Sequence, residues 1–290
     1  MKRNMRALKE NITGYLFITP QMLFFIVFLV YPIYEGIRLS LFKVTYLDER
    51  FVGFANYSTL FNDAVFIKAT LNTVLFVICI VTLTVIFALF VSSAIFDKNA
   101  AYVSFIRGSF YIPFMVSMVV MTMVWSFLLN PANGLISHLA MKLDLSVNLL
   151  GNPNTVMPVI IFVTFATNVG QAIILYVASM IGVPKELFEA AEIDGASRMQ
   201  VIFKILIPSV KPTTVFIIVM NIIAVLKIFV VIQLLTGGGP NNASTTLMYY
   251  LYNNAFKYNQ IGVASAVGVI MFIITLLLSI PHLRTMLKQN

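Results

Sequence analysis

The sequence predicts an all-α, polytopic membrane protein with six transmembrane helices. Hydrophobic residues make up 60% of the 290 residues and charged residues only 10%, and the mean hydropathy is +0.93. A soluble domain carries about a quarter charged residues. A hydrocarbon core about 30 Å thick takes roughly 20 apolar residues of helix to cross. Six apolar runs meet that length, at about 14–36, 69–95, 108–129, 155–180, 212–235 and 263–283.

These runs place the connections between them alternately on the two sides of a membrane. One side, formed by both termini and two connections, holds twelve Lys and Arg residues, whereas the other side holds six. Because cytoplasmic loops carry an excess of Lys and Arg, the sequence predicts a protein of the cell membrane with N- and C-termini both cytoplasmic. No connection is long enough for an independent fold, so residues 1–290 are expected to form a single transmembrane domain. The cytoplasmic connections would be 96–107 and 181–211, and the external ones 37–68, 130–154 and 236–262.

The same residues exclude several classes of function. The net charge of +8 comes from basic residues scattered between apolar runs, so we expect no binding of nucleic acid. A zinc protease needs paired histidines, but His138 and His282 are predicted to lie on opposite sides of the membrane. The nucleophile motif G-x-S-x-G is absent from the sequence as well. We therefore expect no catalytic site and no metal site.

The cytoplasmic connection 181–211 contains a compact polar block, residues 184–208, whose first part is predicted to be a helix. Pro184 and Glu186 suit the first turn of a helix, the proline by its fixed backbone and the carboxylate by the helix dipole. The helix would carry small or apolar residues along one face, with a carboxylate at its end. This face is formed by Leu187, Ala190, Ala191 and Asp194.

The second part of the block is predicted to be another helix after a turn. Gly195 allows the chain to turn. Ser197 and Gln200 have the spacing of a capping box, and Pro208 is expected to end the helix. From the residues alone, two interpretations stay equally open: the block docks in a groove of another protein, or it lies on the membrane surface.

The block resembles the signature of permease subunits of ABC importers. That signature is Glu-Ala-Ala, three residues, Gly, nine residues, then Ile-x-Leu-Pro, and here Ile207 stands in place of the leucine. The residues that match it, including three from its carbohydrate-importer version, are Glu189, Ala190, Ala191, Asp194, Gly195, Ala196, Gln200, Ile205 and Pro208.

The resemblance extends over nearly the whole chain, to the maltose-F-like and glycerol-phosphate-A-like permeases. FVGFANYSTLF at 51–61 is similar to the segment before their second span, and Asn72-Thr73 lie where that family also has them. LTGGGPNNASTTLMYYLYNNAF at 235–256 is similar to the loop after their fifth span, and residues 17–42 to their first span. Val230 departs from the pattern, because many relatives place an aspartate there.

The resemblance implies a role and a set of partners. The block 184–208 would be a coupling helix that docks on a cytoplasmic ATPase, with Gly195 setting its angle. The partners would be a second, homologous permease, two ATPase subunits that bind ATP and Mg, and an extracytoplasmic solute-binding protein. This chain would bind no cofactor itself. Its cargo would be a sugar or oligosaccharide, with a glycerophosphate or another polar solute as the alternative.

An ion-gradient-coupled secondary transporter is the other alternative. Such transporters usually carry carboxylates inside the membrane, and none lies in the central part of any predicted span.

A stripe of neutral polar residues marks one face of the predicted fourth span. Their spacing of i, i+3, i+4 and i+7 places them together on a helix. Lining a path for sugar hydroxyls and forming hydrogen bonds between helices are equally favoured interpretations. The stripe consists of Thr164, Thr167, Asn168 and Gln171.

Three residues of the predicted fifth span complete the candidate substrate path. The resemblance adds Asn221 and Ile228, because maltose-type permeases draw sugar contacts from this span. Lys227 is the charge that falls within it. The lysine could pair with an acidic group, contact a substrate carboxylate or phosphate, or extend to the membrane surface, and we favour a structural role over a substrate contact.

Overall fold

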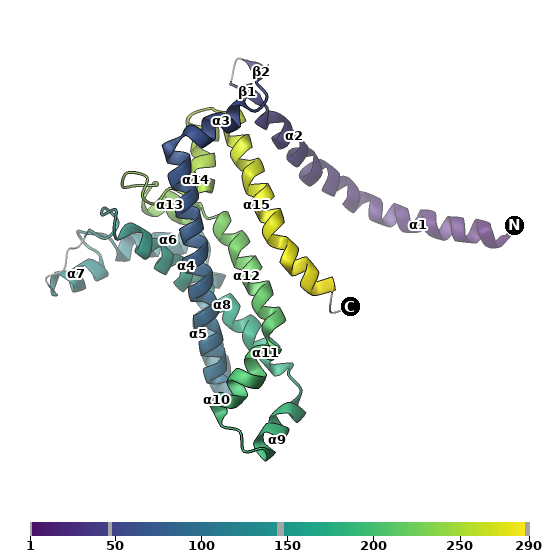
Figure 1. Ribbon diagram of the computed structural model, residues 1–290, viewed down its shortest axis with the longest axis vertical. Helices are drawn as coiled ribbons and strands as arrows, with labels where there is room; N and C mark the ends of the chain where they lie inside the picture. The colour runs from purple at the N-terminus through teal and green to yellow at the C-terminus, as the bar shows by residue number, and fades with distance from the viewer. Residues whose placement is uncertain (1, 46–47, 144–147, 288–290) are drawn as a thin grey trace. The chain divides into compact units, whose positions relative to one another are not determined.

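The computed structural model describes residues 2–45, 48–143 and 148–287, with side chains between residues 14 and 280 of these ranges (Figure 1). The chain forms two compact units. One consists of Met1–Asn62 and Leu251–Ile270, and the other of Asp63–Tyr250 and Met271–Asn290.

The predicted all-α class is confirmed, apart from one short β-hairpin. The first elements are α1 (Lys2–Phe25), a π-helical turn (Ile26–Val30), α2 (Tyr31–Ser40), β1 (Phe42–Val44), β2 (Glu49–Phe51) and α3 (Ala55–Asn62). They are followed by α4 (Ala64–Ile95), α5 (Ala100–Met115), α6 (Met118–Leu128), α7 (Leu135–Met141), α8 (Val156–Ile181), α9 (Lys185–Ile193) and α10 (Arg198–Val201). The last elements are a second π-helical turn (Ile202–Leu206), α11 (Ile207–Ser209), α12 (Lys211–Leu226), α13 (Val230–Leu235), α14 (Leu247–Tyr252), a third π-helical turn (Asn253–Lys257) and α15 (Ile261–Leu287).

Four uninterrupted helical stretches of the described chain are long and apolar enough to cross a membrane. They are Gly14–Ser40, Ala64–Ile95, Val156–Ile181 and Ile261–Ile280. Two bent pairs also qualify if each pair counts as one span, which gives up to six. One pair is α5 with α6, bent by 95°, and the other is Arg198–Ser209 with α12, bent by 63°.

The predicted spans 108–129 and 212–235 are wrong as continuous helices. The first is interrupted at Val116 and Ser117, whose backbones are extended, directly after the helical turn that contains Pro113. Proline removes a backbone donor and weakens a helix at that point. The second ends as a helix at Leu226, and the chain resumes helical structure only in α13.

Within the second unit, α8 is the central helix and packs against α4, α5 and α12. Gly170 allows the backbones of α5 and α8 to come together, because a Cβ atom there would lie 2.0 Å from the carbonyl oxygen of Phe110. Small residues at contacts between membrane helices permit such close approach.

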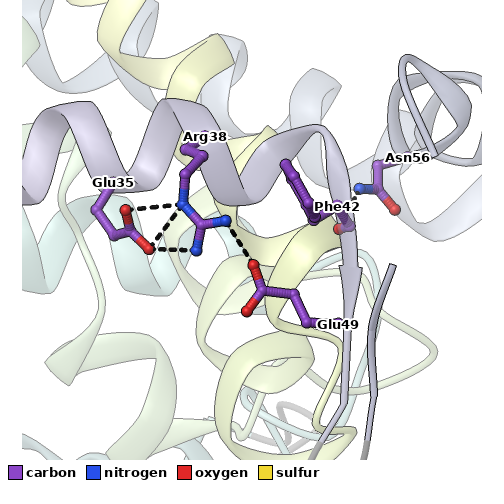
Figure 2. A network of polar contacts seen from close by, with 5 residues as sticks. All are labelled: Glu35, Arg38, Phe42, Glu49 and Asn56. Atoms are coloured by element: carbon purple, nitrogen blue, oxygen red, sulfur yellow. Dashed lines mark hydrogen bonds and ion pairs between the residues drawn. The ribbon is translucent and has the colours of Figure 1, made fainter. Parts of the chain in front are cut away.

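The β-hairpin of the first unit is held by a network around Arg38 (Figure 2). The guanidinium of Arg38 donates to both carboxylate oxygens of Glu35 and to Glu49 of β2, and it lies over the ring of Phe42 at 4.9 Å. The side-chain amide of Asn56 donates to the carbonyls of Ser40 and Phe42, at 2.8 and 2.9 Å. The end of α2, the hairpin and α3 are thereby fastened to one another.

We expect Gly170→Ala to destabilise the protein by about 1–3 kcal/mol, because the added methyl group would force α5 and α8 apart. Thermal unfolding of the purified chain in detergent would measure the effect. The matched control is Gly108→Ala on α5, where a Cβ atom meets nothing within 4 Å. Equal unfolding temperatures for both variants would show that the contact at Gly170 is not tight.

Candidate functional site

The polar block folds as the sequence predicts in its first part, with a small shift at its start. Pro184 precedes α9 as its N-cap residue instead of lying in the first turn, and Glu186 does lie in that turn. Gly195 follows the helix with a φ of +67°. The amide of Ala196 donates to the carbonyl of Ala191 at 2.9 Å, and the amide of Gly195 donates to Glu192 at 3.0 Å. This pair of hydrogen bonds ends a helix at a left-handed glycine.

The second part of the block begins as predicted but ends differently. The capping box is present, with the Gln200 side chain accepting from the Ser197 amide at 2.7 Å. Pro208 does not end the helix, which continues through the π-helical turn and α11 to Ser209. The proline lies in the first turn of α11. A helical turn tolerates proline there, and the chain bends at Val210 instead.

The block carries one face toward the rest of its unit and one face away. Ala191 is only 8% exposed, and the ring of Phe188 lies 5.1 Å from that of Phe96. Glu189, Ala190, Asp194, Gly195 and Gln200 are exposed, whereas Ala196 and Ile205 are half-buried. In Figure 1, α9 lies at one end of this unit, beyond α10 and the start of α5.

Two residues that matter on α9 escaped the sequence analysis. Phe188 anchors the helix, and Ile193 is 86% exposed on its outer side. The signal for both was available, because a bulky apolar residue in a short polar helix must either anchor that helix or remain exposed for a partner.

A cavity of about 260 Å³ lies between α8 and the end of α12. It brings together six of the seven residues predicted for the substrate path: Thr164, Asn168, Gln171, Asn221, Lys227 and Ile228. Thr167 does not line it: the residue is 3% exposed, and its hydroxyl donates to the carbonyl of Val163 at 2.8 Å within α8. Val230, the departure from the family pattern, also lines the cavity.

The cavity offers hydrogen-bonding groups and one ammonium group. The hydroxyl of Thr164 is buried and has no hydrogen-bond partner in the described chain. Asn168 and Asn221 each donate to a carbonyl one turn earlier in their own helices, which leaves their amide oxygens available. Lys227 is exposed to the cavity and forms no ion pair with the described residues. No metal-binding group of His, Cys, Asp or Glu occurs among the residues that the structure describes.

The break between α12 and α13 at residues 227–229 is stabilised by hydrogen bonds from the loop at 236–246. The hydroxyl of Thr246 donates to the carbonyl of Ile228 at 3.2 Å. The side-chain amide of Asn72 on α4 donates to the carbonyls of Asn242 and Thr245, and the hydroxyl of Thr73 accepts from the amide of Leu247.

The glycines at the start of this loop form a turn. Gly238 has a φ of +84°, and a Cβ atom on it would lie 2.6 Å from the hydroxyl of Thr245. Gly237 and Gly238 both adopt positive φ, a conformation that glycine takes readily in turns.

Comparison with known proteins gives relatives that match from end to end. The probable ABC transporter permease YurN of Bacillus subtilis (strain 168) is 36% identical, over 95% of this chain and 96% of the relative. The sn-glycerol-3-phosphate transport system permease UgpA of Escherichia coli O6:K15:H31 (strain 536 / UPEC) is 30% identical, over 93% and 92%. The multiple sugar-binding transport system permease MsmF of Streptococcus mutans serotype c (strain ATCC 700610 / UA159) is 31% identical, over 96% and 97%. These relatives are transport permeases, not enzymes.

The fold is also that of a solved transporter. A chain of a bacterial ABC transporter involved in the import of the acidic polysaccharide alginate superposes with a TM-score of 0.84 and 23% identity, over 97% of this chain and 99% of that one. The family described as "Binding-protein-dependent transport system inner membrane component" matches residues 85–284, more than half of the chain. The resemblance seen in the sequence is thereby confirmed: the chain belongs to the family of binding-protein-dependent transport system inner membrane components.

Proposed function

We propose that this chain forms half of the translocation path of an ATP-driven importer for a sugar or oligosaccharide. The observation that carries the proposal is the cavity in which neutral groups of α8 meet Asn221 and the interrupted fifth span. Amide and hydroxyl groups can form hydrogen bonds with sugar hydroxyls. Burying such polar groups in a membrane costs free energy, so they usually occur where they line a path for a polar solute. A relative named for multiple sugars supports the choice of solute.

The proposal includes the topology. Each bent helix pair counts as one span, which gives six, and both termini lie in the cytoplasm on the basis of the Lys and Arg distribution. The polar block, α9 with α10, then lies on the cytoplasmic side. The loop at 236–246 lies on the opposite side, where a solute-binding protein would deliver its cargo.

The exposed face of α9 would dock on an ATPase subunit that holds ATP and Mg, while this chain binds no cofactor. Glu189, Ala190 and Ile193 are exposed there, a mixture of charged, small and apolar groups that suits a protein contact. A second, homologous permease would complete the path. Nucleotide-driven closure of the ATPases would shift the permeases between two arrangements, so that the cavity opens to each side in turn.

A polar solute with a phosphate is the second candidate, and Lys227 is the observation that favours it. Its ammonium group lines the cavity without a carboxylate among the lining residues. The relative UgpA is named for sn-glycerol-3-phosphate. An ion-gradient mechanism has no comparable support, because the family is one of binding-protein-dependent transport.

The first test is co-purification with an ATPase. The full chain would be co-expressed with a candidate ATPase and second permease, as wild type and as the double variant Glu189→Arg, Gly195→Pro. We expect the wild type to retain the ATPase in detergent and the variant to lose it, because the variant reverses a charge on the exposed face and removes the backbone conformation at φ +67°.

Lys142→Glu is the matched control, since it reverses a charge on the opposite predicted side and should retain the ATPase. If the ATPase stayed bound to the double variant as well as to the wild type, α9 would not be its docking site. If it bound neither form despite an intact second permease, the importer itself would be rejected.

The second test addresses the cavity in proteoliposomes that contain the complete importer. We expect Gln171→Ala to raise KM for uptake about three- to tenfold, because one hydrogen bond contributes about 0.5–1.5 kcal/mol. Thr167→Val on the same helix lies outside the cavity and should leave KM unchanged. Equal effects of the two variants would contradict a substrate role for the cavity.

Lys227→Met distinguishes the two candidate solutes in the same assay. Loss of glycerophosphate uptake with sugar uptake unchanged would support a phosphate contact. Unchanged affinity for both, combined with poor assembly of the importer, would make the lysine structural.

A further inference from the structure

A second cavity, also of about 260 Å³, lies at the opposite end of α8 from the loop that precedes it. Ile95, the last residue of α4, and Ile181, the last residue of α8, both line it, together with Ala100 at the start of α5. Because two candidate membrane spans end here, this cavity would lie near the lipid headgroups of one leaflet.

The polar side of this cavity is basic. Lys98 and Arg107 line it, against the single carboxylate of Asp97 in the same lining. The Nε atom of Arg107 is buried and donates to no acceptor in the described chain. A guanidinium group presents five donors, and a buried donor without an acceptor is costly. An anion in the cavity would supply that acceptor.

The backbone around the cavity contributes partial charges of both signs, so the anion preference comes from the side chains. The N-terminus of the 16-residue helix α5 lies at this end; Asn99 caps it by accepting from the amide of Ala101 at 2.8 Å, and the remaining first amides carry the partial positive charge that favours an anion. The C-termini of α4 and α8 bring partial negative charge to the same end, and at α4 the guanidinium of Arg198 donates to the carbonyls of Ala94 and Phe96.

The other side of the cavity is apolar. Phe96, Val103, Val177 and Met180 line it, and they belong to the hydrophobic cluster shared by α4, α5 and α8. A free inorganic anion would gain no binding energy from these apolar side chains. A phospholipid matches both sides, with its phosphate at the basic groups and its acyl chain along the apolar ones.

We propose that this cavity binds the phosphate group of an anionic phospholipid, with Lys98 and Arg107 as the residues that contact it. The site has a direct route to the polar block. Phe96 lines the cavity, and its ring contacts Phe188 of α9, while its carbonyl accepts from Arg198 at the start of α10. A bound lipid would therefore contact Phe96, the residue that both α9 and α10 contact.

The test measures lipid retention by the full-length chain. Wild type and the double variant Lys98→Gln, Arg107→Gln would be incorporated into vesicles of phosphatidylcholine with phosphatidylglycerol, extracted, and examined by native mass spectrometry. We expect the double variant to retain phosphatidylglycerol roughly tenfold less, because each cation near the membrane surface contributes a several-fold factor. Retention equal to that of the wild type would overturn the proposal.

Three further variants separate the cavity from general surface charge and from misfolding. Lys204→Gln removes an exposed cation outside the cavity lining and should retain the lipid. Ser104→Phe fills the cavity at unchanged charge and should lose it. Arg107→Lys keeps the charge and should retain most of the lipid. Equal losses in Lys204→Gln and the double variant, or full retention in Ser104→Phe, would reduce the effect to surface electrostatics and reject the site.

A competition experiment distinguishes a lipid phosphate from a free phosphate as the bound group. Inorganic phosphate or glycerol phosphate at millimolar concentration should leave the lipid in place. If either displaced it, and bound the wild type but not the double variant in lipid-free detergent, the phosphate site would stand and the lipid as its occupant would be overturned.

Discussion

The arrangement of the candidate substrate path depends on the hydrogen bond from the hydroxyl of Thr246 to the carbonyl of Ile228, at the break between α12 and α13. An unpaired backbone group in hydrocarbon costs several kcal/mol, so a span leaves its helix where a protein group or a cavity can satisfy the backbone. Thr246 is available because Asn72 on α4 holds the neighbouring carbonyl of Thr245. Asn72 thus stabilises the loop at 236–246, and this loop stabilises the break at residues 227–229. The break places Lys227 and Ile228 in the cavity lining.

The sequence predicted best those features that local chemistry decides. The turn at Gly195 and the capping box of Ser197 and Gln200 follow from residues at fixed, short spacing, and the structure has both. The interruptions at residues 116–117 and 227–229 were missed, because a single serine or a single lysine leaves the surrounding run apolar enough to be counted as one span. The second interruption is stabilised by Thr246, eighteen residues after Ile228 in the sequence, which no local pattern reveals.

The polar stripe of α8 shows the same limit at the level of one residue. Helical periodicity correctly joined Thr164, Asn168 and Gln171, which line the cavity, but it also included Thr167. Thr167 lies three residues before Gly170, and residues at that spacing share a helix face. The face of Gly170 is pressed against the backbone of α5, so Thr167 is buried there and satisfied within its own helix. Helical periodicity identifies the polar face of α8, but packing against α5 determines which of its residues reach the cavity.

The placement of α9 suggests how a small displacement of the polar block would reach the cavity. The block is joined to both walls of the cavity, by α8 before it and through the bent pair α10–α12 after it. From Gln171 to the end of α8 the helix is continuous, a distance of about 15 Å at a rise of about 1.5 Å per residue. Ala191 and Phe188 fix α9 against this unit, so under the proposed docking a partner on the exposed face would act on the two walls and not merely on a loop. Under the same proposal the bend at Val210 would make the two walls respond differently, because α8 is one continuous helix whereas α12 meets the preceding helix at an angle of 63°. Unequal movement of the two walls is what a cavity needs in order to open to one side and close to the other.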